Sequence, residues 1–203
     1  MTIAILSQGE PEVNRLVYTI APQCMELNVK IFILIDPRDK QGCQCFDVMR
    51  TLYPSIQLEY REIEEDFGAH RNHAIHQIEN DWVCFLDADE MISPKFLPAL
   101  LHLLPSMDKK KVFYLKRQNV MWDNDPTPID FSFVPEKDAP MDPQGRILHT
   151  SSGYTYKGKI HEVLVDNEGE KYPHEIIGGT DFLIFHNKTS QRLSCTRYSE
   201  WVK

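Results

Sequence analysis

The sequence predicts an α/β fold, in which helices flank a mostly parallel central sheet. Strand-like and helix-like patterns alternate over roughly the first 120 residues, with no internal repeat or low-complexity tract. The chain has 203 residues and is 42% hydrophobic, which suits one well-buried domain. Strands that are separated by helices form parallel sheets covered on both faces. We therefore expect a single domain over residues 1–203.

The first elements form a β-α-β unit. Thr2–Leu6 and Val29–Ile35 are short runs rich in β-branched residues. Between them, Glu12–Ile20 carries apolar residues at the spacing of one helix face.

The alternation continues to about residue 104. Each segment is assigned from its apolar spacing and from the turn or cap residues at its ends. The expected elements are a helix over Phe46–Leu52, a strand over Ile56–Tyr60, a helix over Ala69–Glu79, a strand over Trp82–Leu86, and a helix from the cap Ser93-Pro94 to Leu104.

After about Val112 the regular alternation of strand and helix patterns ends. Val112–Trp122 has the pattern of a strand, but residues 123–146 are polar and rich in proline. Long irregular segments of this kind usually form part of a binding site. Short strand signals return at Tyr154–Tyr156, Val163–Val165 and Phe182–Phe185.

Composition and charge exclude several classes of protein. The formal charge is -8, from 30 acidic and 22 basic residues, which disfavours non-specific binding to a nucleic acid backbone. No run approaches the roughly 20 apolar residues of a membrane span, and the N-terminus lacks the pattern of a signal peptide. The five cysteines show no CxxC pair. We expect a soluble, cytoplasmic protein.

A cluster of carboxylates follows the apolar strand Trp82–Leu86. In extended backbone, Asp87 and Asp89 would point to the same face, with Ala88 turned inward. Two adjacent carboxylates repel each other unless a cation lies between them, and oxygen ligands suit Mg²⁺ or Mn²⁺. The alternative is a solvated turn that caps the next helix.

The segment around this cluster resembles a known family. Residues 66–94 read DFGAHRNHAIHQIENDWVCFLDADEMISP, which joins a Gly-x-x-Arg-Asn helix start to a Leu-Asp-Ala-Asp-Glu strand end. This pattern closely resembles the family 2 glycosyltransferases of the GT-A fold, a Rossmann-like domain. Three later segments look like further landmarks of the bacterial subgroup: Gln144–Ile147, Gly158–Glu162 and Phe185-His186. The segment after Asp36, which reads Pro-Arg-Asp-Lys, departs from the family pattern.

The resemblance implies a function. A metal-dependent, inverting transferase would move a sugar from a nucleotide-sugar donor, with UDP the expected nucleotide, to an acceptor hydroxyl. Residues 1–110 would form the nucleotide-binding half and residues 111–203 the acceptor side. The cofactor would be Mn²⁺ or Mg²⁺, and the acceptor a glycan, a lipid-linked molecule, a protein or a modified nucleobase.

The resemblance also assigns roles to single residues. Each role is carried over to the position that matches the family pattern. The nucleotide would contact Ser7, Asp36, Arg71 and Asp87; the metal would bind Asp87, Asp89 and His186; the diphosphate or the acceptor would contact Arg146, His161 and Trp122; and the catalytic base would be Glu162, with Asp142 as the reserve.

Other interpretations stay open. The chain could be a nucleotidyltransferase, although its first loop has one glycine and no basic residue, or a binding domain without activity. Asp36 could cap a helix, and Arg71 could pair with Asp66 or Glu65. Tyr154 and Tyr156 could stack on a sugar ring, but core positions are the more frequent case. Three helical histidines, His70, His73 and His76, lack the spacing of a zinc site, so we expect surface residues.

Overall fold

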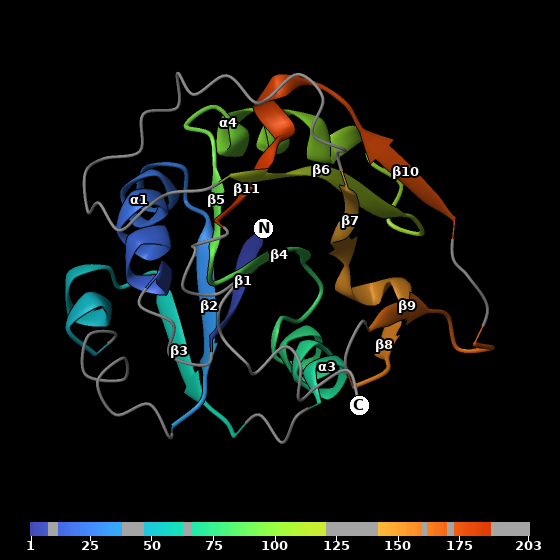
Figure 1. Ribbon diagram of the computed structural model, residues 1–203, viewed down its shortest axis with the longest axis horizontal. Helices are drawn as coiled ribbons and strands as arrows, with labels where there is room; N and C mark the ends of the chain where they lie inside the picture. The colour runs from blue at the N-terminus through green and yellow to red at the C-terminus, as the bar shows by residue number, and fades with distance from the viewer. Residues whose placement is uncertain are drawn as a thin grey trace.

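The computed structural model describes residues 1–7, 12–37, 47–62, 66–120, 142–159, 162–169 and 173–187. Helices lie on both sides of a central sheet (Figure 1). The helices are α1 Glu12–Glu26, α3 Phe67–Gln77 and α4 Phe96–Leu103, and residues 47–52 are also helical. The strands are β1 Thr2–Ser7, β2 Lys30–Ile35, β3 Ile56–Tyr60, β4 Trp82–Asp87, β5 Glu90–Ile92, β6 Val112–Val120, β7 Asp142–His149, β8 Thr155–Lys157, β9 Val163–Val165, β10 His174–Ile177 and β11 Ile184–Asn187.

The sheet is mixed and mostly parallel. Its order is β3-β2-β1-β4-β7-β6-β11-β5. The first four of these strands run parallel to one another, and β7 lies antiparallel between β4 and β6. On its other edge β6 pairs in parallel with β10 and then with β11. The predicted fold class is therefore confirmed.

The two faces of the sheet bury separate cores. Ile3 and Ile5 of β1 join the apolar face of α1, whereas Ala4 and Leu6, which alternate with them, join residues of α3. Side chains along a strand alternate between faces, so one run of apolar residues fills both cores. The hairpin β8–β9 extends the α3 side of the molecule.

Several predicted boundaries were wrong. Helix α1 runs past Ile20 to Glu26, because Ala21 and Cys24 continue its buried stripe around Pro22. Ser93 does not cap α4, which begins at Phe96; its hydroxyl donates to the carbonyl of Asp181 instead.

No helix in the described residues is long and apolar enough to cross a bilayer.

Strand β7 was not predicted. Its first half falls in the stretch 123–146 that we expected to be irregular, and it contains proline and glycine. It forms because its backbone pairs on both edges, with β4 and with β6. This strand places Arg146 in the interior of the sheet, where the residue is 3% exposed.

Candidate functional site

Polar residues gather where three neighbouring parallel strands end. In register, Leu6 of β1 lies opposite Asp87 of β4, and Ser7 lies opposite Ile35 of β2, which precedes Asp36. The amide of Asp36 donates to the carbonyl of Ser7 over 3.1 Å. Both Ser7 and Asp36 are buried. In open α/β sheets ligands bind beyond the carboxyl ends of strands, so this edge is the candidate site.

The carboxylate cluster is divided by a turn. Strand β4 ends at Asp87 and β5 begins at Glu90, so Ala88 and Asp89 form the turn between them. The backbone is therefore not extended through this segment, and the premise of the same-face prediction was wrong. Asp87 and Asp89 have different partners.

Asp87 is held by two arginines. Its Oδ1 accepts from Nη2 of Arg71 over 2.8 Å, and its Oδ2 accepts from Nη2 of Arg146 over 2.6 Å. Burial alone would raise the pKa of Asp87, but Arg146 and Arg71 together hold that pKa well below its usual range. Asp87 is therefore an anion in this structure, with both oxygens engaged.

Glu90 is a buried member of the same network. Its side chain is fully buried, accepts from Arg146 Nη2 over 2.5 Å and accepts from the amide of Asp87 over 2.9 Å. Burial raises the pKa of Glu90 to about 7, with Arg146 opposing the shift and Asp87 adding to it. The two apolar residues that follow Glu90, Met91 and Ile92, are a sequence signal for the buried strand β5.

Arg71 links two carboxylates. Besides Asp87, it contacts Glu162, whose Oε1 accepts from Arg71 Nε over 2.6 Å. The guanidinium carbon lies 5.4 Å from the ring centre of Phe85 and 5.5 Å from that of Tyr156. Asp66, which we considered as a partner of Arg71, instead caps α3 by accepting from the amide of Ala69. Glu65 lies outside the described residues.

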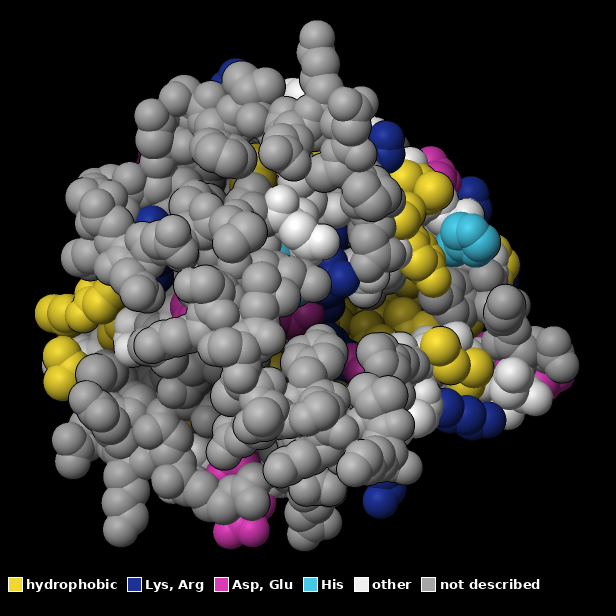
Figure 2. All heavy atoms as spheres, in the orientation of Figure 1, with side chains coloured by type: hydrophobic (Ala, Val, Ile, Leu, Met, Phe, Trp, Pro, Cys, Tyr) yellow, Lys and Arg dark blue, Asp and Glu magenta, His cyan; other side chains and the backbone are white. Residues whose placement is uncertain are grey.

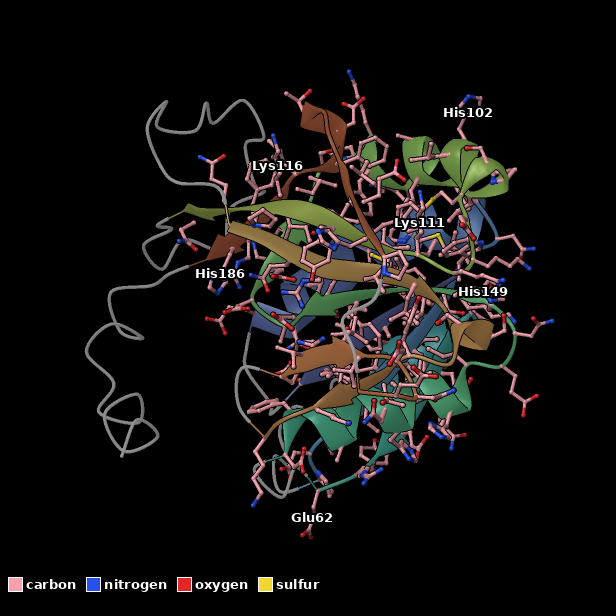
Figure 3. The ribbon with its side chains drawn as sticks, turned by 90° about the vertical axis from the view of Figure 1, so that its right-hand side faces the viewer. Glu62, His102, Lys111, Lys116, His149 and His186 are labelled. Carbon is pink, nitrogen blue, oxygen red and sulfur yellow. The ribbon has the colours of Figure 1, made fainter. Side chains whose placement is uncertain are left out.

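Asp89 contacts a histidine from the far end of the sequence. Nε2 of His186 lies 3.0 Å from Oδ2 of Asp89, and Nδ1 of His186 is hydrogen-bonded to Oδ1 of Asn119 over 2.9 Å. Figure 3 shows His186 at one end of the sheet and His149 at the other. His149 pairs with Trp82 at the start of β4, so His186 lies at the end where β4 finishes.

This pair fits a hard divalent ion. A carboxylate oxygen and an imidazole nitrogen are suitable ligands for Mn²⁺ or Mg²⁺, which usually keep further positions for water and phosphate oxygens. Among the described residues, no group of three or more acidic, histidine or cysteine side chains is arranged to hold a metal.

One histidine prediction was wrong. His70 is 1% exposed, rather than on the surface, and its Nε2 has no hydrogen-bond partner among the residues that the structure describes. Burial lowers the pKa of His70 to about 4; the charge of Arg61 adds to the shift, and a hydrogen bond with the backbone of Arg61 opposes it. His73 is half-buried beside Glu59, and His76 is exposed.

Other predicted residues are placed as follows. Asp142 begins β7 opposite Arg117, while its side chain lies outside the description. Trp122 and His161 are not among the described residues. Tyr154 and Tyr156 are buried, which confirms the core interpretation.

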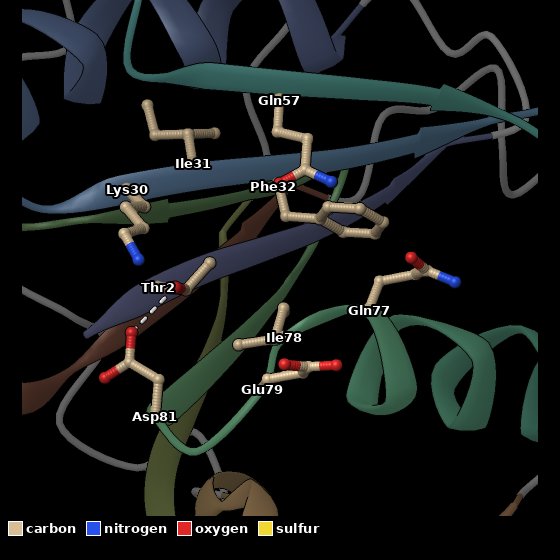
Figure 4. Close-up of a pocket in the computed structure, with 9 residues that line it drawn as sticks. All are labelled: Thr2, Lys30, Ile31, Phe32, Gln57, Gln77, Ile78, Glu79 and Asp81. Carbon is tan, nitrogen blue, oxygen red and sulfur yellow. Dashed lines mark hydrogen bonds between the residues drawn. The ribbon is translucent and has the colours of Figure 1, made fainter.

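A small pocket at the opposite end of the strands does not suit a nucleotide. It has a volume of about 60 Å³ and lies beside Thr2, Lys30 and Asp81 (Figure 4). Thr2 and Lys30 begin β1 and β2, so this pocket is remote from Asp87.

Figure 2 shows acidic and basic side chains next to one another near the centre of one face.

Comparisons with known proteins bear on the family and the fold of the chain. A family model described as glycosyltransferase like family 2 matches residues 2–139. Comparison with curated protein sequences gave no match.

Three solved structures of residues 1–349 of TarS from S. aureus share the fold. The first is 12% identical, with a TM-score of 0.60, and the match covers 92% of this chain and 60% of that one. The complex with UDP-GlcNAc is 13% identical (TM-score 0.54; 89% and 59% covered), and the complex with UDP is 14% identical (TM-score 0.54; 89% and 61% covered). The chain thus spans about 60% of the length of these structures.

Proposed function

The chain belongs to glycosyltransferase-like family 2, and from this premise we propose that it transfers a sugar from a nucleotide-sugar donor to an acceptor hydroxyl. The observation that carries the proposal is the Asp89–His186 contact beside the arginine-bound Asp87, at the carboxyl end of β4. A UDP-sugar is the donor we favour. It is supported by the TarS structures of the same fold, which were solved with UDP-GlcNAc and with UDP.

Asp36 and Ser7 would bind the nucleoside. They follow adjacent parallel strands, and their burial gives a site from which most water is excluded. A carboxylate at Asp36 can accept a hydrogen bond from an N–H group of the base, and the hydroxyl of Ser7 can donate or accept.

Asp89 and His186 would hold Mn²⁺ or Mg²⁺. When bound there, the ion would neutralise negative charge on the departing nucleoside diphosphate. The role of Asp87 as a further ligand remains a prediction. In this structure its oxygens accept from Arg71 and Arg146, so an ion bound by Asp87 would share these oxygens with the arginines.

Arg146 is expected to act through Asp87 and Glu90. Its side chain is 4% exposed and pairs with both carboxylates, so it is not directed to solvent where a diphosphate would approach. It neutralises part of the negative charge that these acids bring into the interior.

Glu162 would act as the general base. It would take the proton of the acceptor hydroxyl as the oxygen attacks the anomeric carbon from the face opposite the leaving group, which inverts the configuration. Its side chain is 15% exposed and accepts from Arg71, so it lies at the border between the buried network and solvent. The acceptor is a glycan, a lipid-linked molecule, a protein or a modified nucleobase.

Thermal unfolding with nucleotides tests the proposal. The panel contains UDP, GDP, CMP and TDP, each with and without Mn²⁺, on the wild type and on Asp89→Ala. We expect UDP with Mn²⁺ to raise the Tm of the wild type but not that of the variant, since a ligand that binds only the folded state stabilises it. Release of sugar from UDP-sugars is then measured. Stabilisation without any turnover would indicate a binding domain, and no stabilisation by any nucleotide would contradict the proposal.

A further inference from the structure

The hairpin β8–β9 is docked onto the first two turns of α3. The amide of Phe67 donates to the carbonyl of Lys159 over 3.0 Å. The side-chain amide of Asn72 makes both hydrogen bonds to the backbone of Tyr156, donating over 2.8 Å and accepting over 2.6 Å. Glu162 follows this hairpin's turn directly, so the position of its backbone depends on how the hairpin sits on the helix.

Arg71 provides the ionic part of this docking. One edge of its guanidinium binds Glu162 on the hairpin through Nε, and the other binds Asp87 at the end of β4 through Nη2. The group is planar, and its N–H bonds point in fixed directions, so it holds both carboxylates in one geometry. The rings of Phe85 and Tyr156 lie near its carbon and restrict its plane.

The surroundings of Arg71 leave it little access to a substrate. Its side chain is 8% exposed, and two of its nitrogens are bound to carboxylates of the protein. A cation that is matched by two carboxylates of the protein is stabilised where it lies, and withdrawing it toward a ligand would break its ion pairs with Glu162 and Asp87.

We propose that Arg71 is a positioning residue that fixes Glu162 relative to Asp87, in place of the nucleotide contact expected from the resemblance. The proposal rests on the proposed function, in which Glu162 is the base. A base has to lie within hydrogen-bond reach of the proton it removes, and a displacement of about 1 Å can cost about 100-fold in rate. Arg71 thus couples the donor side of the site to the acceptor side.

Hydrogen exchange tests the positioning without any substrate. In Arg71→Met, we expect amide exchange over residues 162–165 to rise about tenfold, while β1 and β4 keep their protection. The matched variant Asn72→Ala removes the two uncharged hydrogen bonds to the backbone of Tyr156 in β8. In this variant the increase in amide exchange should centre on residues 155–157. Unchanged exchange at 162–165 in Arg71→Met would overturn the proposal.

A second variant covers the case in which Arg71→Met does not fold. Glu162→Ala removes the same contact from the hairpin side, where the side chain is partly exposed. It should raise exchange over residues 162–165 to a similar extent, and wild-type exchange in this variant would equally contradict the proposal.

Kinetics separates positioning from substrate binding. With water as the acceptor and a UDP-sugar as the donor, Arg71→Ala should lower kcat by about 100-fold and leave KM within about threefold. Added guanidinium ion should restore part of the activity of Arg71→Ala. Arg71→Lys should remain slow, because an ammonium group lacks the planar set of N–H donors that binds two carboxylates at once. A raised KM with normal kcat would show that Arg71 contacts the donor and would overturn the proposal. If the wild type turns over no nucleotide-sugar, the proposed function fails, and the exchange experiment still decides the role of Arg71.

Discussion

Gly68, in the first turn of α3, lies against the carbonyl oxygen of Gly158 in the turn after β8. A Cβ atom built on Gly68 would lie 2.5 Å from that oxygen, which is closer than such atoms approach in proteins. The neighbouring atom is backbone, so it has no flexible side chain that can move away. The close docking of the β8–β9 hairpin on α3 therefore requires glycine at position 68.

Gly68→Ala should destabilise the protein, although alanine normally favours a helix over glycine by about 0.5–1 kcal/mol. The added methyl group would push the hairpin away from α3, so we expect a net loss of about 1–3 kcal/mol. The matched control is Gly178→Ala, where a Cβ meets nothing within 4 Å. Urea unfolding of both variants checks this, and equal stabilities would contradict it.

Glu90→Ala should cost about 3–5 kcal/mol of unfolding free energy. The change leaves Arg146 with one buried partner fewer and removes the acceptor for the amide of Asp87, and breaking a buried ion pair from one side is strongly destabilising. The control is Glu175→Ala, which breaks an exposed pair with Lys111 and should cost less than about 1 kcal/mol. Similar losses in the two variants would show that the Glu90 network contributes little.

Local patterns predicted most of the fold. Strands β1 to β4 and their helices could be predicted because the spacing of apolar residues within each segment indicates a strand or a helix. This spacing depends only on residues that are close together in the sequence. Strand β7 was missed because Pro143 and Gly145 weaken its β character, and its pairing with β4 and β6 depends on residues far away. Strand β5 has only three residues, and no element was predicted there.

The contacts among the candidate site residues could not be predicted from the sequence. The resemblance selected Arg71, Glu162, Asp89 and His186, but Arg71 and Glu162 are 91 positions apart, and Asp89 and His186 are 97 apart. No local pattern indicates which of these side chains meet. The burial of His70 did have a local signal, since it lies one helical turn before the buried Ala74.

Acid should destabilise the protein through His70. The folded-state pKa of about 4 lies below the ordinary 6.5, so between these values the unfolded chain binds a proton that the folded protein does not. Stability from this group is therefore full above about pH 6.5 and falls as the pH drops toward 4. Between pH 7 and pH 5, the contribution of His70 to the free energy of unfolding falls by about 2 kcal/mol.

His70→Gln removes this titration. Denaturant unfolding at pH 7 and at pH 5 should show a smaller loss in the variant than in the wild type, by about 2 kcal/mol. His76→Gln is the control, because His76 is exposed on the same helix. If the wild type and His70→Gln lost the same stability between these pH values, the buried neutral state of His70 would be contradicted.

Asn119 should support metal binding through His186. Its Oδ1 lies 2.9 Å from Nδ1 of His186, so that nitrogen carries the proton of the hydrogen bond and Nε2 is directed at Asp89. Partners of this kind orient a ligating histidine, and their loss typically weakens metal affinity about 10–100-fold. Titration of Mn²⁺ into the protein with saturating UDP, followed by calorimetry, should show this weakening in Asn119→Ala.

Two further variants complete the metal test. His186→Ala removes a proposed ligand and should weaken Mn²⁺ binding at least as much as Asn119→Ala, since the supporting residue acts only through the ligand. His102→Ala removes an exposed histidine of α4, which Figure 3 shows away from His186, and should leave the Kd unchanged. An unchanged Kd in His186→Ala would remove this histidine from the metal site.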